Sequence, residues 1–273
     1  MAQAVLGDVT LDYEVVGDGD PVVLVCGAGQ PSIGWRLEVV PALNAAGFAT
    51  LVFDSRGMPP SSSPPAPYSV AQLADDTLRL ADHVGWSRFS IVGYSLGGWV
   101  AEELSLTESD RISAAVLIGS LNRGTAWERA VTTVERDLAA SGVPLPELFE
   151  SVETLRYLPN HELQDDTTVE TWLSMLGGDP WPNPGRLGQY EACLAWTLDT
   201  DRTKRWATCQ VPCLVVAFEH DVDSPPARAR EAAAELPDAT YVEIAGASHL
   251  GPFTHGAAVC EALVPFLSSR RGG

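Results

Sequence analysis

The chain has 273 residues, of which 45% are hydrophobic and 19% charged, and its formal net charge at pH 7 is −19. This length and composition suit one large soluble α/β domain, with or without an insert. The negative charge would repel nucleic acid and anionic membranes, so we expect neither as a partner. We expect a small-molecule substrate instead, bound by a monomer or a homodimer.

Cysteine usage and the amino terminus indicate the cellular compartment in which the protein acts. The first residues show no basic region followed by a long apolar run, and no stretch approaches the roughly 20 apolar residues that span a membrane. The five cysteines lack the spacing of a disulfide framework, which favours reduced thiols in a cytoplasmic protein. Cys209 and Cys213 are spaced like two metal ligands, but no second His or Cys pair completes a site. We therefore expect no metal and no cofactor.

Short apolar runs along the chain predict the strands of a sheet. Residues 9–16 alternate between apolar and polar side chains, which is typical of an antiparallel edge strand. Continuous runs, typical of buried parallel strands, lie at residues 22–26, 49–53, 89–92, 114–118, 213–218 and 241–244. Helical patterns between them lie at residues 35–46, 70–81, 99–106 and 257–267. This alternation predicts an α/β fold, a mostly parallel twisted sheet with helices on both faces.

One of these strands leads into a serine that the local sequence exposes. Residues 93–98 read Gly-Tyr-Ser-Leu-Gly-Gly, directly after a strand and before a helical pattern. A serine in so sharp a turn has a strained backbone, and Gly93 and Gly97 have no Cβ that could clash there. The turn lifts the Ser95 hydroxyl above the sheet edge, at the positive end of the helix. The strand–turn–helix context favours a nucleophile over a plain glycine-rich turn.

The alternation of strands and helices stops between residues 121 and 209. Helical patterns are expected there at residues 126–141, 168–176 and 187–197, without a convincing buried strand. We predict a core formed by residues 1–120 and 210–273. Residues 121–209 form the insert, a helical cap over the strand ends.

The insert is rich in tryptophan. Five of the eight tryptophans of the chain fall in it, at positions 127, 172, 181, 196 and 206. Large aromatic side chains usually serve packing, so each can simply attach the insert to the core. The alternative is that they line a substrate pocket, and we name Trp127, Trp172 and Trp181 as candidates for substrate contact.

Five segments, in order, make the whole chain resemble the α/β-hydrolase family, closest to its capped esterase, peroxidase-like and biosynthetic members. They are Gly27-Ala28 (similar to its oxyanion loop), Asp54-Ser55-Arg56-Gly57 (the loop after the next strand), Gly93–Gly98 (its nucleophile elbow), Phe218–Asp221 (its acid loop) and Gly246–His249 (its histidine loop). The chain departs from the family at Cys26, where a His is usual. We interpret Cys26 as a small buried hydrophobic group rather than a reactive thiol.

The remaining members of a nucleophilic site follow from chemistry and chain order. Ser95 must lose its proton as it attacks, and His249 is the expected base because it lies in a Gly/Ala/Ser loop after a strand. The base needs a buried carboxylate, and Asp221 directly ends a buried strand. Asp223 is the rival acid, because strand ends are uncertain by a few residues.

The oxyanion of an acyl-transfer intermediate needs donors that are already in place. We expect these to be the backbone N–H groups of Ala28 and Leu96. Gln30 and Tyr94 are further candidates for substrate contact, although a turn role is equally open for Gln30.

A serine nucleophile narrows the reaction. Epoxide and haloalkane hydrolysis on this fold use a carboxylate nucleophile, which leaves acyl transfer to water. We therefore expect hydrolysis of an ester or thioester of a small to medium apolar substrate, through an acyl-enzyme on Ser95. Two alternatives stay open: a non-hydrolytic enzyme (lyase, C–C bond hydrolase, cofactor-free peroxidase or cyclase of secondary metabolism), or a protein that only binds a ligand.

Overall fold

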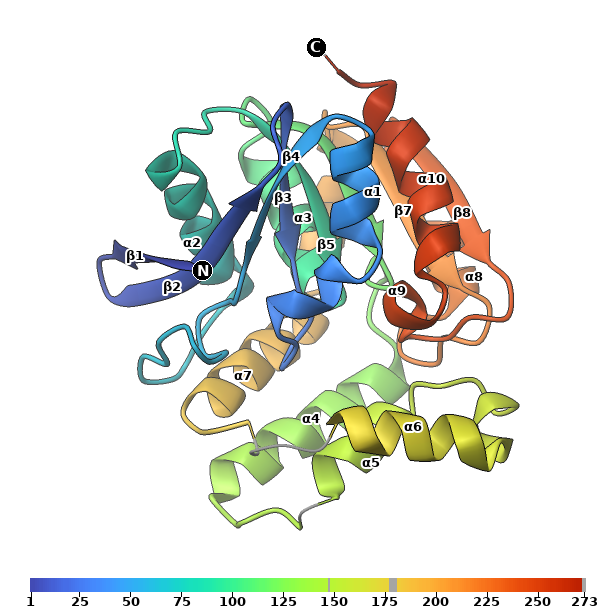
Figure 1. The fold of residues 1–273 in the computed structure, drawn as a ribbon. Helices are drawn as coiled ribbons and strands as arrows, with labels where there is room; N and C mark the ends of the chain where they lie inside the picture. The colour runs from blue at the N-terminus through green and yellow to red at the C-terminus, as the bar shows by residue number, and fades with distance from the viewer. Residues whose placement is uncertain (147, 177–180, 272–273) are drawn as a thin grey trace.

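A sheet of eight strands forms the centre of the molecule in the computed structural model, which describes residues 1–146, 148–176 and 181–271 (Figure 1). The strands are β1 (Ala2–Leu6), β2 (Val9–Val16), β3 (Asp20–Val25), β4 (Phe48–Phe53), β5 (Phe89–Tyr94), β6 (Ile112–Ile118), β7 (Cys213–Phe218) and β8 (Ala239–Ile244). Their order is β1-β2-β4-β3-β5-β6-β7-β8, and every pair from β4 to β8 is parallel. This confirms the predicted α/β class. The sequence reading missed β1, which takes the edge position predicted for residues 9–16.

Helices cover both faces of the sheet because successive strand residues point to opposite faces. In β3, Val23 and Val25 pack with α2 (Val70–His83), α3 (Leu96–Thr107) and α8 (Pro226–Ala233). Val22 and Leu24 pack on the other side, with α1 (Val39–Ala45) and α10 (Gly256–Ser268). The short α9 (Gly251–Thr254) precedes α10. The continuous apolar strands are thus explained by burial on two faces.

The helix predicted over residues 35–46 is shorter than expected. The chain forms a 3₁₀ turn, η1 (Ser32–Arg36), and the α-helix begins only at Val39. Pro41 explains the late start, since a proline ring clashes with the carbonyl four residues earlier and is tolerated only in the first turn. The expected stop at Gly47 is confirmed, with a φ of +85°.

The described residues between β6 and β7 form helices and 3₁₀ turns joined by loops, without a strand. They are α4 (Ala126–Ser141), α5 (Phe149–Leu155), η2 (Glu162–Gln164), α6 (Asp166–Leu176), α7 (Gly185–Leu198) and η3 (Arg202–Thr208). They gather at one end of the sheet (Figure 1), and α7 packs on the core through Ala192, Cys193 and Trp196. The exact domain boundaries stay a prediction.

A buried ion pair fastens the insert to the helix that follows Ser95. Glu102 of α3 is 3% exposed and Arg202 of η3 is 2% exposed, and their closest charged atoms lie 2.8 Å apart. The indole of Trp206 donates to the same carboxylate, and the Arg202 guanidinium also donates to the Asn122 carbonyl. The end of the insert is therefore tied to the middle of α3, the helix that begins directly after Ser95.

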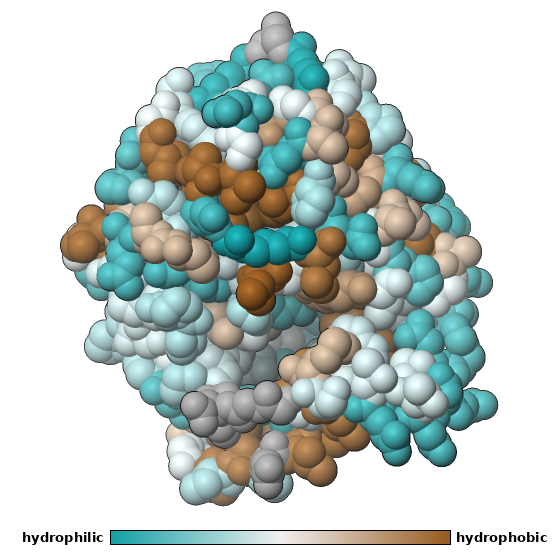
Figure 2. All heavy atoms as spheres, in the orientation of Figure 1, coloured by the Kyte–Doolittle hydropathy of each residue, from teal (hydrophilic) through white to brown (hydrophobic). Residues whose placement is uncertain are grey.

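Figure 2 shows hydrophilic residues over much of one face of the molecule, interspersed with hydrophobic patches. No helix of the described residues combines the length and apolar character that a membrane crossing requires.

Candidate active site

Ser95 occupies a one-residue turn between β5 and α3. Its φ of +52° is the only positive φ of a non-glycine residue in the described part of the chain. The flanking glycines make the turn possible, since a Cβ on Gly93 would lie 2.0 Å from the carbonyl oxygen of Gly97. A Cβ on Gly97 would lie 2.2 Å from the carbonyl oxygen of Val25. Such strain persists where the surrounding structure enforces it, and it is concentrated at functional sites.

The predicted base and acid meet Ser95 at this turn. His249 Nε2 lies 3.1 Å from Ser95 Oγ, and His249 Nδ1 lies 2.8 Å from Asp221 Oδ2. His249 is 7% exposed and Asp221 is 3% exposed. The three residues follow β5, β7 and β8, whose carboxyl ends meet at one edge of the sheet. A hydroxyl, an imidazole and a carboxylate are thus joined in one hydrogen-bonded chain.

The two candidate acids have different partners. The second oxygen of Asp221, Oδ1, accepts from the N–H groups of Asp223 at 2.9 Å and Ser224 at 2.8 Å. The carboxylate of Asp223 instead accepts from the indole of Trp127 at 3.0 Å. The structure therefore places Asp221, and not Asp223, against the imidazole of His249.

Negative groups around His249 favour its charged form. Burial alone would lower the pKa of His249, but the charge and hydrogen bond of Asp221 outweigh it and raise the pKa to about 9. Asp223 and Glu128, the latter from the insert helix α4, act in the same direction. The site thus stabilises the imidazolium that forms when His249 accepts a proton.

Two tyrosine rings contact the imidazole. Tyr94 is 1% exposed, its ring centre lies 5.2 Å from that of His249, and its hydroxyl donates to the His249 carbonyl at 2.7 Å. This bond supports the backbone of His249, and the predicted substrate contact by Tyr94 stays a prediction. Tyr157, which follows α5 in the insert, lies 5.0 Å from the same imidazole. Sequence reasoning missed Tyr157, because no motif marks an aromatic residue in the insert.

The glycine loop after β3 passes directly against the nucleophile. A Cβ on Gly27 would lie 3.2 Å from Ser95 Cβ and 3.0 Å from Gln30 Oε1, a buried atom without a hydrogen-bond partner in the described structure. None of the hydrogen bonds of the described residues uses the N–H of Ala28 or of Leu96. A role of these two amides as oxyanion donors stays a prediction.

The three insert tryptophans named as substrate contacts all join the insert to the core. Trp127 is 54% exposed and reaches Asp223, as described above. Trp181 lies on the glycine loop, where a Cβ on Gly29 would be 2.7 Å from its ring, and its indole donates to the Gly57 carbonyl at 2.8 Å. Trp172 packs in a small cluster with Leu250, the neighbour of His249. Substrate contact by these side chains stays a prediction.

The structure also places the Cys26 thiol and the potential metal ligands that the sequence analysis considered. Cys26 is 4% exposed, and burial raises the pKa of its thiol, which agrees with a small packing group. No cluster of three or more potential ligands for a metal occurs among the described His, Cys, Asp and Glu residues.

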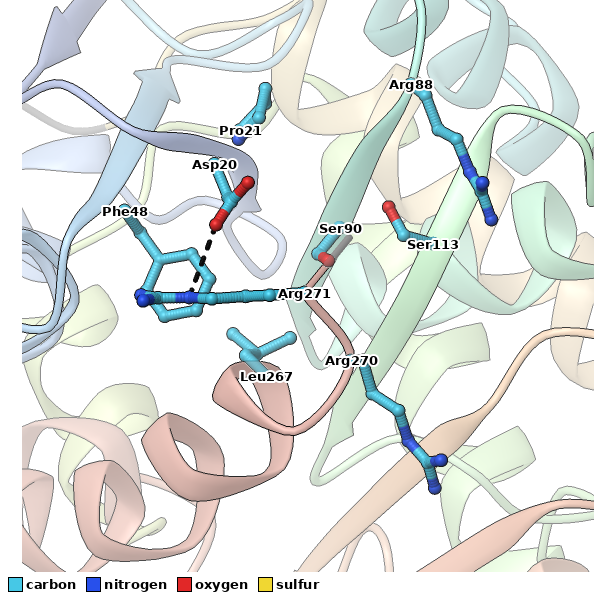
Figure 3. A pocket seen from close by; sticks show the side chains of 9 residues that line it. All are labelled: Asp20, Pro21, Phe48, Arg88, Ser90, Ser113, Leu267, Arg270 and Arg271. Atoms are coloured by element: carbon cyan, nitrogen blue, oxygen red, sulfur yellow. Dashed lines mark ion pairs between the residues drawn. The ribbon is translucent and has the colours of Figure 1, made fainter. Parts of the chain in front are cut away.

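A hollow of about 180 Å³ lies near the amino ends of the strands, where Arg271 pairs with Asp20 at 3.3 Å (Figure 3). It is at the end of the sheet opposite Ser95.

Comparison with known proteins places this geometry in a family. The model of the family described as "Alpha/beta hydrolase family" matches residues 22–262. The chain belongs to this family. The match runs from β3 through the histidine loop and into α10, so it includes every residue of the hydrogen-bonded chain described above.

The names of individual relatives refer to different reactions. The chain is 31% identical to BpoC of Mycobacterium tuberculosis H37Rv, provisionally named a non-heme bromoperoxidase, over 96% of this chain and 98% of that protein. The crystal structure of BpoC superposes with a TM-score of 0.87, covering 96% of this chain and 97% of the other. The rhodomycin D methylesterase DnrP of Streptomyces peucetius is 26% identical over 90% of each chain. These relatives support an α/β-hydrolase enzyme and leave the substrate open.

Proposed function

We propose that this protein is a serine hydrolase that cleaves an ester or thioester of a small to medium apolar substrate. The observation that carries the proposal is the unbroken chain from Ser95 Oγ through His249 to Asp221, at 3.1 and 2.8 Å. A serine in this arrangement is an activated nucleophile, because its proton has an acceptor that a buried carboxylate orients. The methylesterase among its relatives supports the same reaction class.

In the proposed reaction, His249 Nε2 takes the proton of Ser95 as Oγ attacks the acyl carbon. The N–H groups of Ala28 and Leu96 bind the oxyanion, at the positive end of α3. The intermediate collapses to the acyl-enzyme, and His249 returns the proton to the leaving alcohol or thiol. Water then attacks the acyl carbon as His249 takes one of its protons. His249 returns that proton to Ser95 Oγ as the bond from Oγ to the acyl carbon breaks, which releases the acid and restores the Ser95 hydroxyl.

We further propose that the insert acts as a cap that holds the acyl group over Ser95. Tyr157, Trp181 and Glu128 support this, because each brings the insert against the site. The five unpaired buried thiols are in keeping with action in the reducing cytoplasm.

Hydrolysis of p-nitrophenyl esters from acetate to octanoate, and of matching acyl thioesters, tests the proposal. Wild type should turn over the substrates with a length optimum set by the insert. The Ser95→Ala variant should lose several orders of magnitude in kcat. Equal turnover by wild type and the folded variant would refute the proposal.

A second candidate is favoured by the name of BpoC. In it, hydrogen peroxide replaces water as the acceptor of the acyl group from Ser95, and the product is a peracid. Peracid formed from an acyl ester and hydrogen peroxide, at a rate above that of hydrolysis, would favour this reaction; its absence would favour simple hydrolysis.

A further inference from the structure

Gln189 of α7 joins the insert to two loops of the core. Its side chain is 1% exposed, so both ends of its amide must find partners within the protein. Oε1 accepts from the N–H of Gly29 at 3.0 Å, and Nε2 donates to the carbonyl of Arg56 at 2.8 Å. One partner is a donor and the other an acceptor, so they fix which end of the amide is oxygen.

The Gly29 N–H belongs to the peptide that directly follows Ala28. Gly29 has a φ of +67°, and Trp181 from the insert lies where its Cβ would be. The loop's own bond, from the N–H of Gln30 to the carbonyl of Gly27, is long at 3.3 Å. The hydrogen bond that the Gly29 N–H donates to Gln189 is therefore a strong constraint on the peptide next to Ala28.

The other end of the bridge is held firmly. The side chain of Arg56 is 1% exposed and makes two bonds to Asp76, at 2.5 and 2.8 Å, and two to Asp8, at 3.1 and 3.4 Å. Gln189 thus ties a small glycine loop to a rigid, buried point of the core. The tie runs through a side chain that the insert supplies.

We propose that Gln189 is a positioning residue that aims the Ala28 N–H at the acyl oxygen. The inference rests on the proposed function, in which that amide binds the oxyanion. Gln189 itself touches no reacting atom. It acts through the Ala28–Gly29 peptide, and makes stabilisation of the transition state depend on the docking of α7.

Gln189→Met tests the proposal, since methionine has similar length and can make neither bond. A shift of the oxyanion donor by about 1 Å costs on the order of 100-fold in rate. We expect kcat on an ester to fall by about 10- to 100-fold with KM changed by less than about threefold, because the donor acts mainly in the transition state. The affinity for an alkyl boronic acid, which places a tetrahedral oxygen at the same position, should fall in parallel with kcat.

Arg205→Met is the matched control. It removes another polar link between insert and core, the 2.8 Å pair with Glu103, which has no contact with the glycine loop. Its kcat should stay within about twofold of wild type, because this partly exposed ion pair joins η3 to α3 and not to the glycine loop. If Gln189→Met does not fold, Gln189→Leu replaces it, because leucine too can make neither bond; kcat should again fall by about 10- to 100-fold, and an unchanged kcat would overturn the proposal.

The outcomes separate the two proposals. A wild type without ester turnover and without labelling of Ser95 would contradict the hydrolase function itself. An active wild type with kcat and boronic acid affinity unchanged in Gln189→Met would overturn the positioning role and leave the hydrolase function standing. An equal fall in kcat in Arg205→Met would also overturn the positioning role, because loosening the insert at any point would then be enough to lower kcat.

Discussion

Replacing Asp221 by Asn should disable the site while leaving its shape intact. Oδ1 of Asp221 accepts from two backbone N–H groups, and Oδ2 faces His249 Nδ1 at 2.8 Å. In Asp221→Asn the amide oxygen must stay with the two N–H donors, so the NH₂ group turns to His249. Nδ1 must then accept, and the only proton of the neutral ring moves to Nε2, where it faces Ser95. The imidazole can no longer take the serine proton.

The expected loss is about 10⁴-fold in kcat, as for other sites of this kind, or roughly 5 kcal/mol of transition-state stabilisation. Steady-state hydrolysis of a p-nitrophenyl ester measures it, with circular dichroism to show that the variant is folded. Asp223→Asn is the matched control, because Asp223 bonds to Trp127 and not to His249; it should stay within about tenfold of wild type, since a single exposed hydrogen bond is lost. An Asp221→Asn variant within tenfold of wild type would refute the assignment.

Three further outcomes follow from the structure. His249 must be neutral to accept a proton, and its pKa is raised from the ordinary histidine value of 6.5 to about 9. We therefore expect kcat/KM to rise with pH, with a midpoint above 6.5. A midpoint at or below 6.5 would contradict the raised pKa of His249. Glu102→Ala leaves Arg202 buried without its carboxylate and should lower the free energy of unfolding in urea by about 3–5 kcal/mol; a loss under about 1 kcal/mol would show that the pair is not buried. Gly97→Ala puts a Cβ 2.2 Å from a carbonyl of β3 and should not fold, whereas Gly142→Ala, with nothing within 4 Å, should cost only about 1–2 kcal/mol.

The sequence predicted the parts of the site that obey local rules. Gly-x-Ser-x-Gly between a strand and a helix requires the strained turn at Ser95, and chain order directs attention to Asp221 and His249. The choice between Asp221 and Asp223 was open, because two residues of uncertainty at a strand end cannot decide which carboxylate faces inward. The backbone bonds to Oδ1 of Asp221 decide it.

The contributions of the insert escaped prediction for a different reason. Gln189 and Tyr157 contact loops more than 90 residues away in sequence, and neither belongs to a recognisable motif. Helical patterns predict that α7 exists, but not which of its side chains meets the glycine loop. The bond from the Tyr94 hydroxyl to the His249 carbonyl is likewise not encoded in the motif, because it joins residues 155 positions apart in the chain.

Intact-protein mass after exposure to a fluorophosphonate tests the central claim most directly. The account predicts one adduct on wild type, located on Ser95 and absent from Ser95→Ala, because only a serine with a base and an oxyanion site is reactive enough to form it. A folded wild-type protein that forms no adduct, or one that is still labelled in Ser95→Ala, would contradict the claim that Ser95 is the activated nucleophile.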